Sequence, residues 1–190
     1  MRSHTSARPL DRVLLPIVAL IGLVSVAAPS SLAAQRGPGT RAMLPGMDGP
    51  ILLDTMALAV PIAGNRDSIF AALTTVFNEL KIPVQLNDPK HSLMNNLNAD
   101  VSRRLGGQPM SRYIDCGRGF SGNNADIYRI TLAVTAWIDP TEGDPQRLMV
   151  AIAASGRDPS GSHSAYTVCT SRGALEKRIG ERVQQLAGKS

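Results

Sequence analysis

An alternation of apolar and mixed residues between Asp126 and Asp139 constrains the fold more than any other feature of the chain. The apolar positions are Tyr128, Ile130, Leu132, Val134, Ala136 and Ile138, and the residues between them are Arg129, Thr131, Ala133, Thr135 and Trp137. Successive side chains of a β-strand point to opposite faces of the sheet. The pattern therefore predicts a half-buried antiparallel strand with one apolar face.

A second long strand is expected directly after the first. The segment 139–147 is polar and rich in turn residues, and residues 148–155 again place an apolar side chain at every second position. Two alternating segments joined by a polar turn are typical of a β-hairpin. Shorter strand candidates occupy residues 51–60, 84–86, 91–101, 113–116 and 164–169.

Two other segments have the periodicity of amphipathic helices. The first starts after a cap residue, Asn65 or Asp67, and cannot continue past Pro83. The second starts near Ser171 and can end at Gly188. The apolar positions of each helix share one face, with Ile69, Leu73, Val76, Phe77 and Leu80 in the first, and Leu175, Ile179, Val183 and Leu186 in the second.

Together these elements predict an α+β fold over residues 51–190, formed as a single domain. We expect an antiparallel sheet of about five or six strands, which is a common size. Both amphipathic helices would pack on one face of this sheet, and the C-terminal helix would close the domain. Glycine and proline dominate residues 35–50, so this segment is predicted to be a flexible linker.

The N-terminus has the three-part pattern of a secretory signal. The arginines Arg2, Arg8 and Arg12 precede an uncharged apolar run from Val13 to Ala28, and small residues follow it. The pattern predicts a signal peptide over residues 1–34 with cleavage after Ala33 or Ala34. The run is shorter than the ~20 residues of a spanning helix. We therefore expect a periplasmic or secreted protein, and the alternative is an uncleaved segment that anchors the chain to the inner membrane.

The chain has two cysteines, Cys116 and Cys169. In an oxidising compartment an even pair of cysteines predicts a disulfide bond, and two free buried thiols are the alternative. No C-x-x-C pair occurs, the two cysteines lie far apart in the sequence, and His91 and His163 are isolated, so no metal site is expected. No cofactor is expected either.

Charge and composition argue against nucleic acid as a partner. The net charge is +5, but the basic residues are scattered and form no run. Aromatic residues make up 4% of the chain, so few side chains are available for stacking on bases. A weak attraction to anionic surfaces is the most that this charge indicates.

Motifs that carry chemistry are weak in this sequence. Gly117, Gly119 and Gly122 form a G-x-G-x-x-G pattern, but a strand follows it, whereas a phosphate site needs the N-terminus of a helix. We interpret the pattern as a flexible loop that exposes Phe120. The residues Ser160, Ser162, His163 and Ser164 cluster without the strand-to-helix turn of a catalytic serine. Whether Asp88, His91 and Asp100 lie together depends on the fold, so no catalytic residue is assigned.

Trp137 lies on the less apolar face of the strongest strand. It is either a core residue beneath a helix or an exposed anchor for a partner. Trp137 and Phe120 are therefore the two candidate partner contacts.

The order of elements over residues 51–188 resembles the repeating unit of the outer-membrane assembly lipoprotein family NlpB/BamC. In that unit a helix and a short apolar turn lead into paired strands with an acid between them, and Leu80, Ile82, Val84 and Asp88 match this layout. The chain differs in lacking a cysteine for N-terminal lipid modification and in having Cys116 and Cys169. The resemblance implies a non-catalytic envelope domain, and no functional residue is carried over from it.

Since no reactive constellation stands out, we expect an exported, non-enzymatic binding or assembly module of the bacterial envelope. Its partner would be an envelope protein or an apolar ligand. Two alternatives remain. A sheet that grips a long helix can leave a cavity for a small hydrophobic ligand, as in a carrier. An exported hydrolase would use serine, or an Asp/His pair, from the loops.

Overall fold

The computed structural model of the chain describes residues 37–141, 143, 145–161 and 165–188. The predicted signal peptide and its cleavage positions, Ala33 and Ala34, lie outside the described residues. The described residues belong to one compact unit, Ala34–Ser190. Within them, no helix combines the length and the apolar character that crossing a membrane requires.

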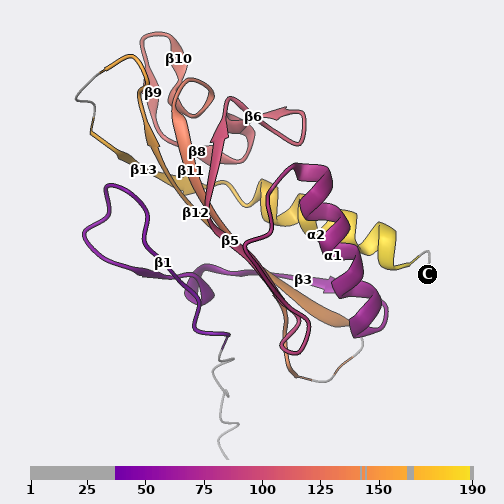
Figure 1. The fold of residues 1–190 in the computed structure, drawn as a ribbon. Coiled ribbons are helices and arrows are strands. Elements are labelled where there is room, and N and C mark those ends of the chain that lie inside the picture. Colours follow the sequence, from indigo (N-terminus) through magenta and orange to yellow (C-terminus); the bar gives the residue numbers. More distant parts are fainter. Residues whose placement is uncertain (1–36, 142, 144, 162–164, 189–190) are drawn as a thin grey trace, which may run out of the picture. The chain divides into compact units, whose positions relative to one another are not determined.

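The fold is α+β, as the sequence predicts, with a seven-stranded antiparallel sheet and two helices (Figure 1). Strands β11 (Arg129–Ile138) and β12 (Gln146–Arg157) form the predicted hairpin at its centre. On the other side, β11 pairs with β5 (Leu93–Ser102), which pairs with β4 (Leu86–Asp88).

Two short strands share the remaining edge of β12. Strand β3 (Leu58–Ile62) pairs with the start of β12, and β13 (Thr167–Ser171) pairs with its end. Strand β8 (Ile114–Asp115) then extends the sheet beyond β13. The sheet exceeds the expected five or six strands because one edge of the 12-residue β12 holds two partners in succession.

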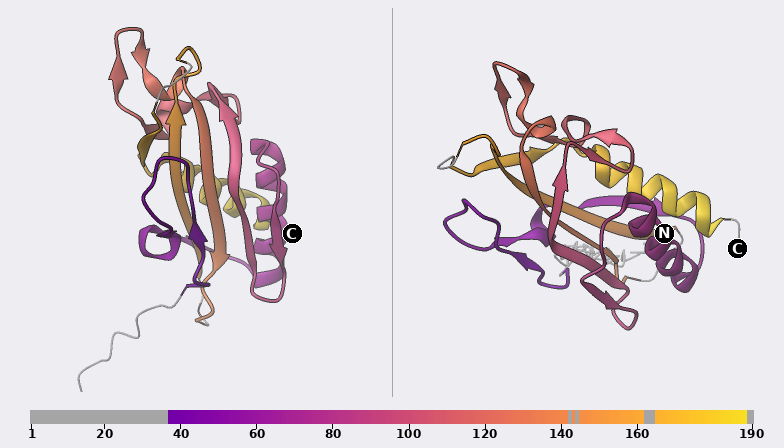
Figure 2. Two further views of the ribbon diagram at one scale, coloured as in Figure 1. Left: turned by 60° about the vertical axis from the view of Figure 1, so that its left-hand side comes forward. Right: turned by 45° about the horizontal axis from the view of Figure 1, so that its top comes forward.

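Helix α1 (Arg66–Leu80) and helix α2 (Ala174–Ala187) cover the same face of the sheet, as predicted (Figure 2). Asn65 caps α1, and its side-chain oxygen accepts a hydrogen bond of 2.8 Å from the backbone N–H of Ser68. The apolar faces of both helices form one continuous core with the even-numbered residues 130–138 of β11. The helical periodicity in the sequence therefore identified the true core face.

The N-cap of helix α2 is Gly173, two residues after the predicted cap residue Ser171. Ser171 still acts in the start of the helix: its Oγ accepts the N–H of Gly173 at 3.0 Å and donates to Oε1 of Glu176 at 2.5 Å. In a capping box, the glutamate at the third helical position accepts the backbone N–H of the N-cap residue directly. Here the Ser171 hydroxyl lies between the two groups and connects the N–H of Gly173 to Glu176.

The prediction of a flexible linker over residues 35–50 is wrong from Gly37 onward. Strand β1 (Arg41–Ala42) pairs with β2 (Ile51–Leu52), and the N–H of Gly39 donates to Oδ2 of Asp54 at 2.7 Å. Ala42 and Leu44 are each 1% exposed. The glycines and prolines shape turns in this segment, and its apolar side chains are part of the folded domain.

Residues 37–57 form a cover on the face of the sheet opposite the helices (Figure 2). Because of this cover, the prediction that the strand over Asp126–Asp139 is half-buried is also wrong: β11 is buried on both faces from Ile130 to Ile138. A second core joins cover residues to odd-numbered sheet residues, and it contains Ala42, Leu44, Leu53, Leu93, Ala133, Trp137, Ala151 and Ala153. The 3₁₀ helix η1 (Leu53–Met56) belongs to the cover and interrupts the single strand expected over 51–60.

The chain between β5 and β11 builds small elements at one end of the sheet, which we call the loop end (Figure 1). Two hairpins lie there, β6 (Arg104–Leu105) with β7 (Gln108–Pro109), and β9 (Arg118–Gly119) with β10 (Gly122–Asn123). The 3₁₀ helices η2 (Met110–Arg112) and η3 (Asn124–Asp126) follow them.

Candidate functional site

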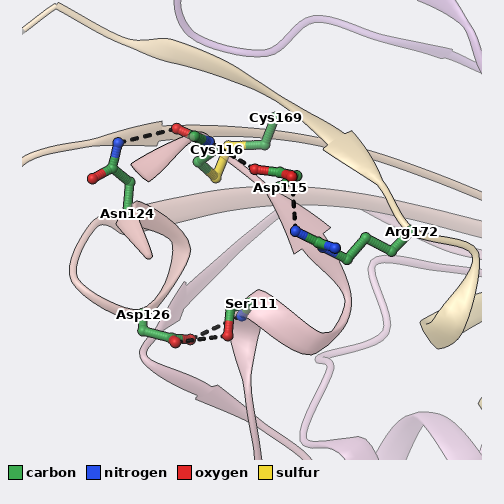
Figure 3. Close-up of polar contacts among 8 residues, drawn as sticks. Ser111, Asp115, Cys116, Asn124, Asp126, Cys169 and Arg172 are labelled. Atoms are coloured by element: carbon green, nitrogen blue, oxygen red, sulfur yellow. Dashed lines mark hydrogen bonds and ion pairs between the residues drawn. A yellow bond between two sulfur atoms is a disulfide. The ribbon is translucent and has the colours of Figure 1, made fainter. Parts of the chain in front are cut away.

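The predicted disulfide bond between Cys116 and Cys169 is present, with sulfur atoms 2.05 Å apart and Cα atoms 4.3 Å apart (Figure 3). Cys116 lies two residues before β9, and Cys169 lies in β13. Both residues are buried. The bond therefore attaches the base of the β9–β10 hairpin to a strand of the main sheet.

Backbone and side-chain hydrogen bonds also fix the base of this hairpin. The N–H of Asn124 donates to the carbonyl of Gly117 at 3.1 Å, and Nδ2 of Asn124 donates to the carbonyl of Cys116 at 3.2 Å (Figure 3). The N–H of Gly117 donates to Oδ1 of Asp115 at 2.9 Å. The two ends of the hairpin are thus joined to each other where they leave the domain.

Two further contacts hold the segments beside the hairpin base. Nη2 of Arg172 lies 2.7 Å from Oδ2 of Asp115, which ties β8 to the residue that follows β13. Asp126 accepts hydrogen bonds from both the backbone N–H and the hydroxyl of Ser111, at 2.8 and 2.7 Å (Figure 3). These contacts link η2 to η3, so the hairpin stands on a tightly connected platform.

Phe120 lies between β9 and β10, at the tip of the hairpin, and its side chain is fully exposed, as the sequence interpretation expected. The flexible loop expected at the G-x-G-x-x-G pattern is instead a short β-hairpin, which the glycines of the pattern build. Gly122 has φ +121°, and a Cβ atom at Gly119 would lie 2.8 Å from Oδ1 of Asn124. The short η3 and strand β11 follow the pattern, so the helix that a phosphate site needs is not at this position.

The loop end is basic. From residue 103 to residue 129 the arginines are Arg103, Arg104, Arg112, Arg118 and Arg129, and the only acidic residues are Asp115 and Asp126. Asp115 is paired with Arg172, and Asp126 accepts its two hydrogen bonds from Ser111. The surface around the hairpin therefore has an excess of positive charge.

Trp137, the other candidate partner contact, is 5% exposed and belongs to the second core. The core interpretation is right, although residues 37–57 cover Trp137 instead of a helix. Its ring still lines a cleft of about 420 Å³ at the end of the sheet opposite the loop end. Arg66 and Lys90 also line this cleft, and the sequence had assigned neither to a site.

The fold brings Asp88 and His91 together but leaves Asp100 apart. Nδ1 of His91 lies 2.6 Å from Oδ2 of Asp88 beside the Trp137 cleft. The hydrogen bond from His91 is the main cause that holds the pKa of Asp88 below its usual value. Asp100 lies seven residues beyond Leu93 along β5, which is about 23 Å in an extended strand.

The polar stretch that contains Ser160 shows no catalytic arrangement where it is described. The Ser160 hydroxyl donates to Oδ1 of Asp158 at 2.7 Å, as in an ordinary turn, while Ser162, His163 and Ser164 lie outside the described residues. Across the described part of the chain, no three His, Cys, Asp or Glu side chains are grouped in a way that could hold a metal ion.

No protein-family model matches this chain, and no curated protein matches it. The function must therefore be argued from the geometry of the hairpin and the cleft.

Proposed function

We propose that this chain is an exported, non-enzymatic module of the bacterial envelope that docks onto a partner protein through the β9–β10 hairpin. The observation that carries this proposal is the full exposure of Phe120 at the tip of a hairpin whose base is fixed by the Cys116–Cys169 disulfide. The signal-like N-terminus and the disulfide support export, because disulfides persist in oxidising compartments.

An exposed apolar side chain is ordinary on a protein surface, so exposure alone argues little. What distinguishes Phe120 is its rigid support. Docking an already ordered hairpin loses less conformational entropy than docking a mobile loop. Aromatic residues that fill a pocket on a partner contribute much of the binding energy in many interfaces. Phe120 is well placed to be such an anchor.

The charges around Phe120 indicate the kind of partner. Arg118 is exposed and lies two residues before Phe120 in the same hairpin. Arg112 lies in the neighbouring η2. A partner that offers an apolar pocket bordered by carboxylates would complement this surface and would associate faster at low salt. The resemblance to the NlpB/BamC family, through the layout of Leu80, Ile82, Val84 and Asp88, also supports a non-catalytic envelope domain.

A site-specific crosslink tests the docking site. Phe120 is replaced by the photoreactive p-benzoylphenylalanine in the full chain in its native bacterium, and the crosslinked protein is identified and purified. We then measure how tightly this purified partner binds the mature chain. We expect the F120A variant to bind the partner at least tenfold more weakly than the wild type, and R118E to bind it several-fold more weakly. The control M43A changes another exposed apolar residue, 65% exposed, and should bind normally. Equal binding by F120A, or crosslinking to lipid alone with binding to anionic vesicles, would overturn the proposal.

Export has a separate test. Cell fractionation followed by N-terminal sequencing should find the mature chain in the periplasm or the medium, beginning at Ala34 or Gln35. An intact N-terminus in the inner-membrane fraction would instead support the anchored alternative.

The structure bears differently on the two alternative functions, a carrier of a small hydrophobic ligand and a hydrolase. A carrier would need space between α1 and the sheet, but Ile69, Leu73 and Phe77 fill this region and are each fully buried. The hydrolase alternative has one favourable observation, the Asp88–His91 pair beside a cleft. A hydrolytic activity of the purified chain that H91Q abolishes, with the fold intact, would support it over the binding module.

A further inference from the structure

We propose that the cleft beside Trp137 binds a small organic carboxylate, with its apolar body against Trp137 and its carboxylate near Arg66 and Lys90. This site lies at the other end of the sheet from the Phe120 hairpin, so the inference goes beyond the docking function and does not depend on it. The cleft volume of about 420 Å³ is within the range of small-molecule sites.

The cleft has an apolar wall made of residues that the fold already holds in place. Leu93, Trp137 and Ile138 line it, and they are 7%, 5% and 1% exposed. Pro38 from the cover segment and Pro140 from the turn after β11 also contribute. A wall of this kind favours a ligand with an aliphatic or aromatic body.

Arg66 lines the same cleft in a fixed orientation. Its Nε donates to Oγ of Ser92 at 2.8 Å, and Nη1 and Nη2 donate to the carbonyl oxygens of Asp139 and Ile138 at 3.2 and 3.0 Å. All three acceptors are neutral, and no carboxylate among the described residues lies within ion-pair distance of Arg66. A guanidinium has five N–H donors, so two remain available for a ligand.

The other charged residues of the cleft leave a positive excess. Lys90 is exposed and forms no ion pair within the described residues. The one carboxylate that lines the cleft, Asp88, is engaged by His91, both through the ring and through the backbone N–H at 3.2 Å. Two permanent cations therefore face one carboxylate that already has a partner, which favours an anionic ligand.

The combination of an apolar wall and paired cations selects for a ligand with both features. A carboxylate accepts hydrogen bonds from guanidinium in a well-matched geometry. A neutral molecule of the same shape would lose that contact, and a small inorganic anion would lose the apolar one. The carboxylate could belong to a fatty acid or to the C-terminus of an apolar peptide, which share this chemistry.

Trp137 provides a direct readout, because it is the only tryptophan of the chain. The mature chain is titrated with octanoate, with octanol, and with an apolar tripeptide that has either a free or an amidated C-terminus, while Trp137 emission is followed. We expect a saturable change with octanoate or with the free-acid peptide, and at least tenfold weaker binding of the matching neutral compound. Which of the two acids binds more tightly identifies the source of the carboxylate.

Charge reversal tests the role of the cations. K90E should weaken binding of the carboxylate at least fivefold and leave binding of octanol unchanged. The matched control K177E, at an exposed position of α2 outside the cleft, should bind as the wild type does. R66M should weaken binding more strongly, and K90E remains decisive if R66M fails to fold. Equal affinity for acid and neutral compound, no saturable change with any of the four, or unchanged binding by K90E would overturn the inference.

Discussion

Gly180 of helix α2 lies directly against Val60 of strand β3: a Cβ atom at position 180 would be 2.6 Å from Cγ1 and 2.8 Å from Cγ2 of Val60. Real Cβ atoms essentially never approach other heavy atoms closer than 3.0 Å. A glycine weakens a helix interior, so its presence here reflects the close approach of α2 to the sheet.

The substitution G180A should therefore destabilise the domain, although alanine is the better helix former. The helix gains about 1 kcal/mol from alanine, but forcing a methyl group into packed side chains costs about 1–3 kcal/mol. We expect a net loss of up to about 2 kcal/mol in the free energy of unfolding, measured by urea denaturation. The double variant V60A/G180A removes the clashing methyls and should lose less than the sum of the single changes. A stabilised G180A would show that α2 can move away from β3.

Removal of the disulfide should destabilise the domain and loosen the Phe120 hairpin. The bond closes a loop of 53 residues, and loop-closure entropy for this length corresponds to about 4 kcal/mol. We expect C116S/C169S to unfold at clearly lower urea concentration and to lose hydrogen-exchange protection at Asn124. Mass analysis of the wild type without reductant should find no alkylatable thiol. Two free thiols in the purified protein would contradict the bond.

The cover formed by residues 37–57 should contribute to stability like any other part of the core. L44A removes a side chain that is 1% exposed and should cost about 2–4 kcal/mol. Its neighbour Met43 is 65% exposed, and M43A should change stability by less than about 0.5 kcal/mol. The emission of Trp137 should shift to longer wavelength in L44A, because water reaches the second core. If L44A and M43A had the same stability and the same Trp137 emission, residues 37–57 would be a linker and not part of the core.

The contact between α1 and α2 should make stability depend on pH. Arg182 donates to both carboxylate oxygens of Glu79, at 2.8 and 2.7 Å, and this hydrogen bonding holds the pKa of Glu79 below its usual value. A lowered pKa in the folded state stabilises the fold above the unfolded-state pKa of about 4.3, and this contribution is lost as the pH falls through the folded-state pKa.

We therefore expect the wild type to be more stable than E79Q at pH 7, with a difference that shrinks as the pH falls to about 3, well below the usual glutamate pKa. Urea midpoints over this range measure the effect. R182Q should return the pKa of Glu79 toward its usual value in an NMR titration of the carboxyl carbon. A difference between wild type and E79Q that grows on acidification would contradict the sign.

The sequence predicted those elements whose signals are local. The cap at Asn65 and the apolar period up to Leu80 located α1, and the alternation on both sides of residues 139–147 located the β11–β12 hairpin. The pairing of Cys116 with Cys169 followed from there being only two cysteines in a chain whose N-terminal sequence predicts export.

The cover and the cleft were not predictable in the same way. Ala42 and Leu44 stand among glycines and prolines with no repeating period, so nothing local distinguishes them from a linker. Two of the three acceptors that fix Arg66 lie 72 and 73 residues further along the chain, in Ile138 and Asp139. Apolar residues in the cover, however uneven their spacing, were a signal that could have been weighed.

The sequence alone determined the α+β class, the helix face that enters the core, the disulfide pair and the exposure of Phe120. These features depend on periodicity, capping and residue chemistry within short segments. Only the tertiary structure decided that Trp137 is buried, that residues 37–57 belong to the domain, and that Arg66, Lys90 and Trp137 share one cleft. The reason is physical: the odd face of β11 has a mixed pattern that does not show whether it is covered, and the segment that covers Ala133 and Trp137 is decided by contacts between residues almost a hundred positions apart.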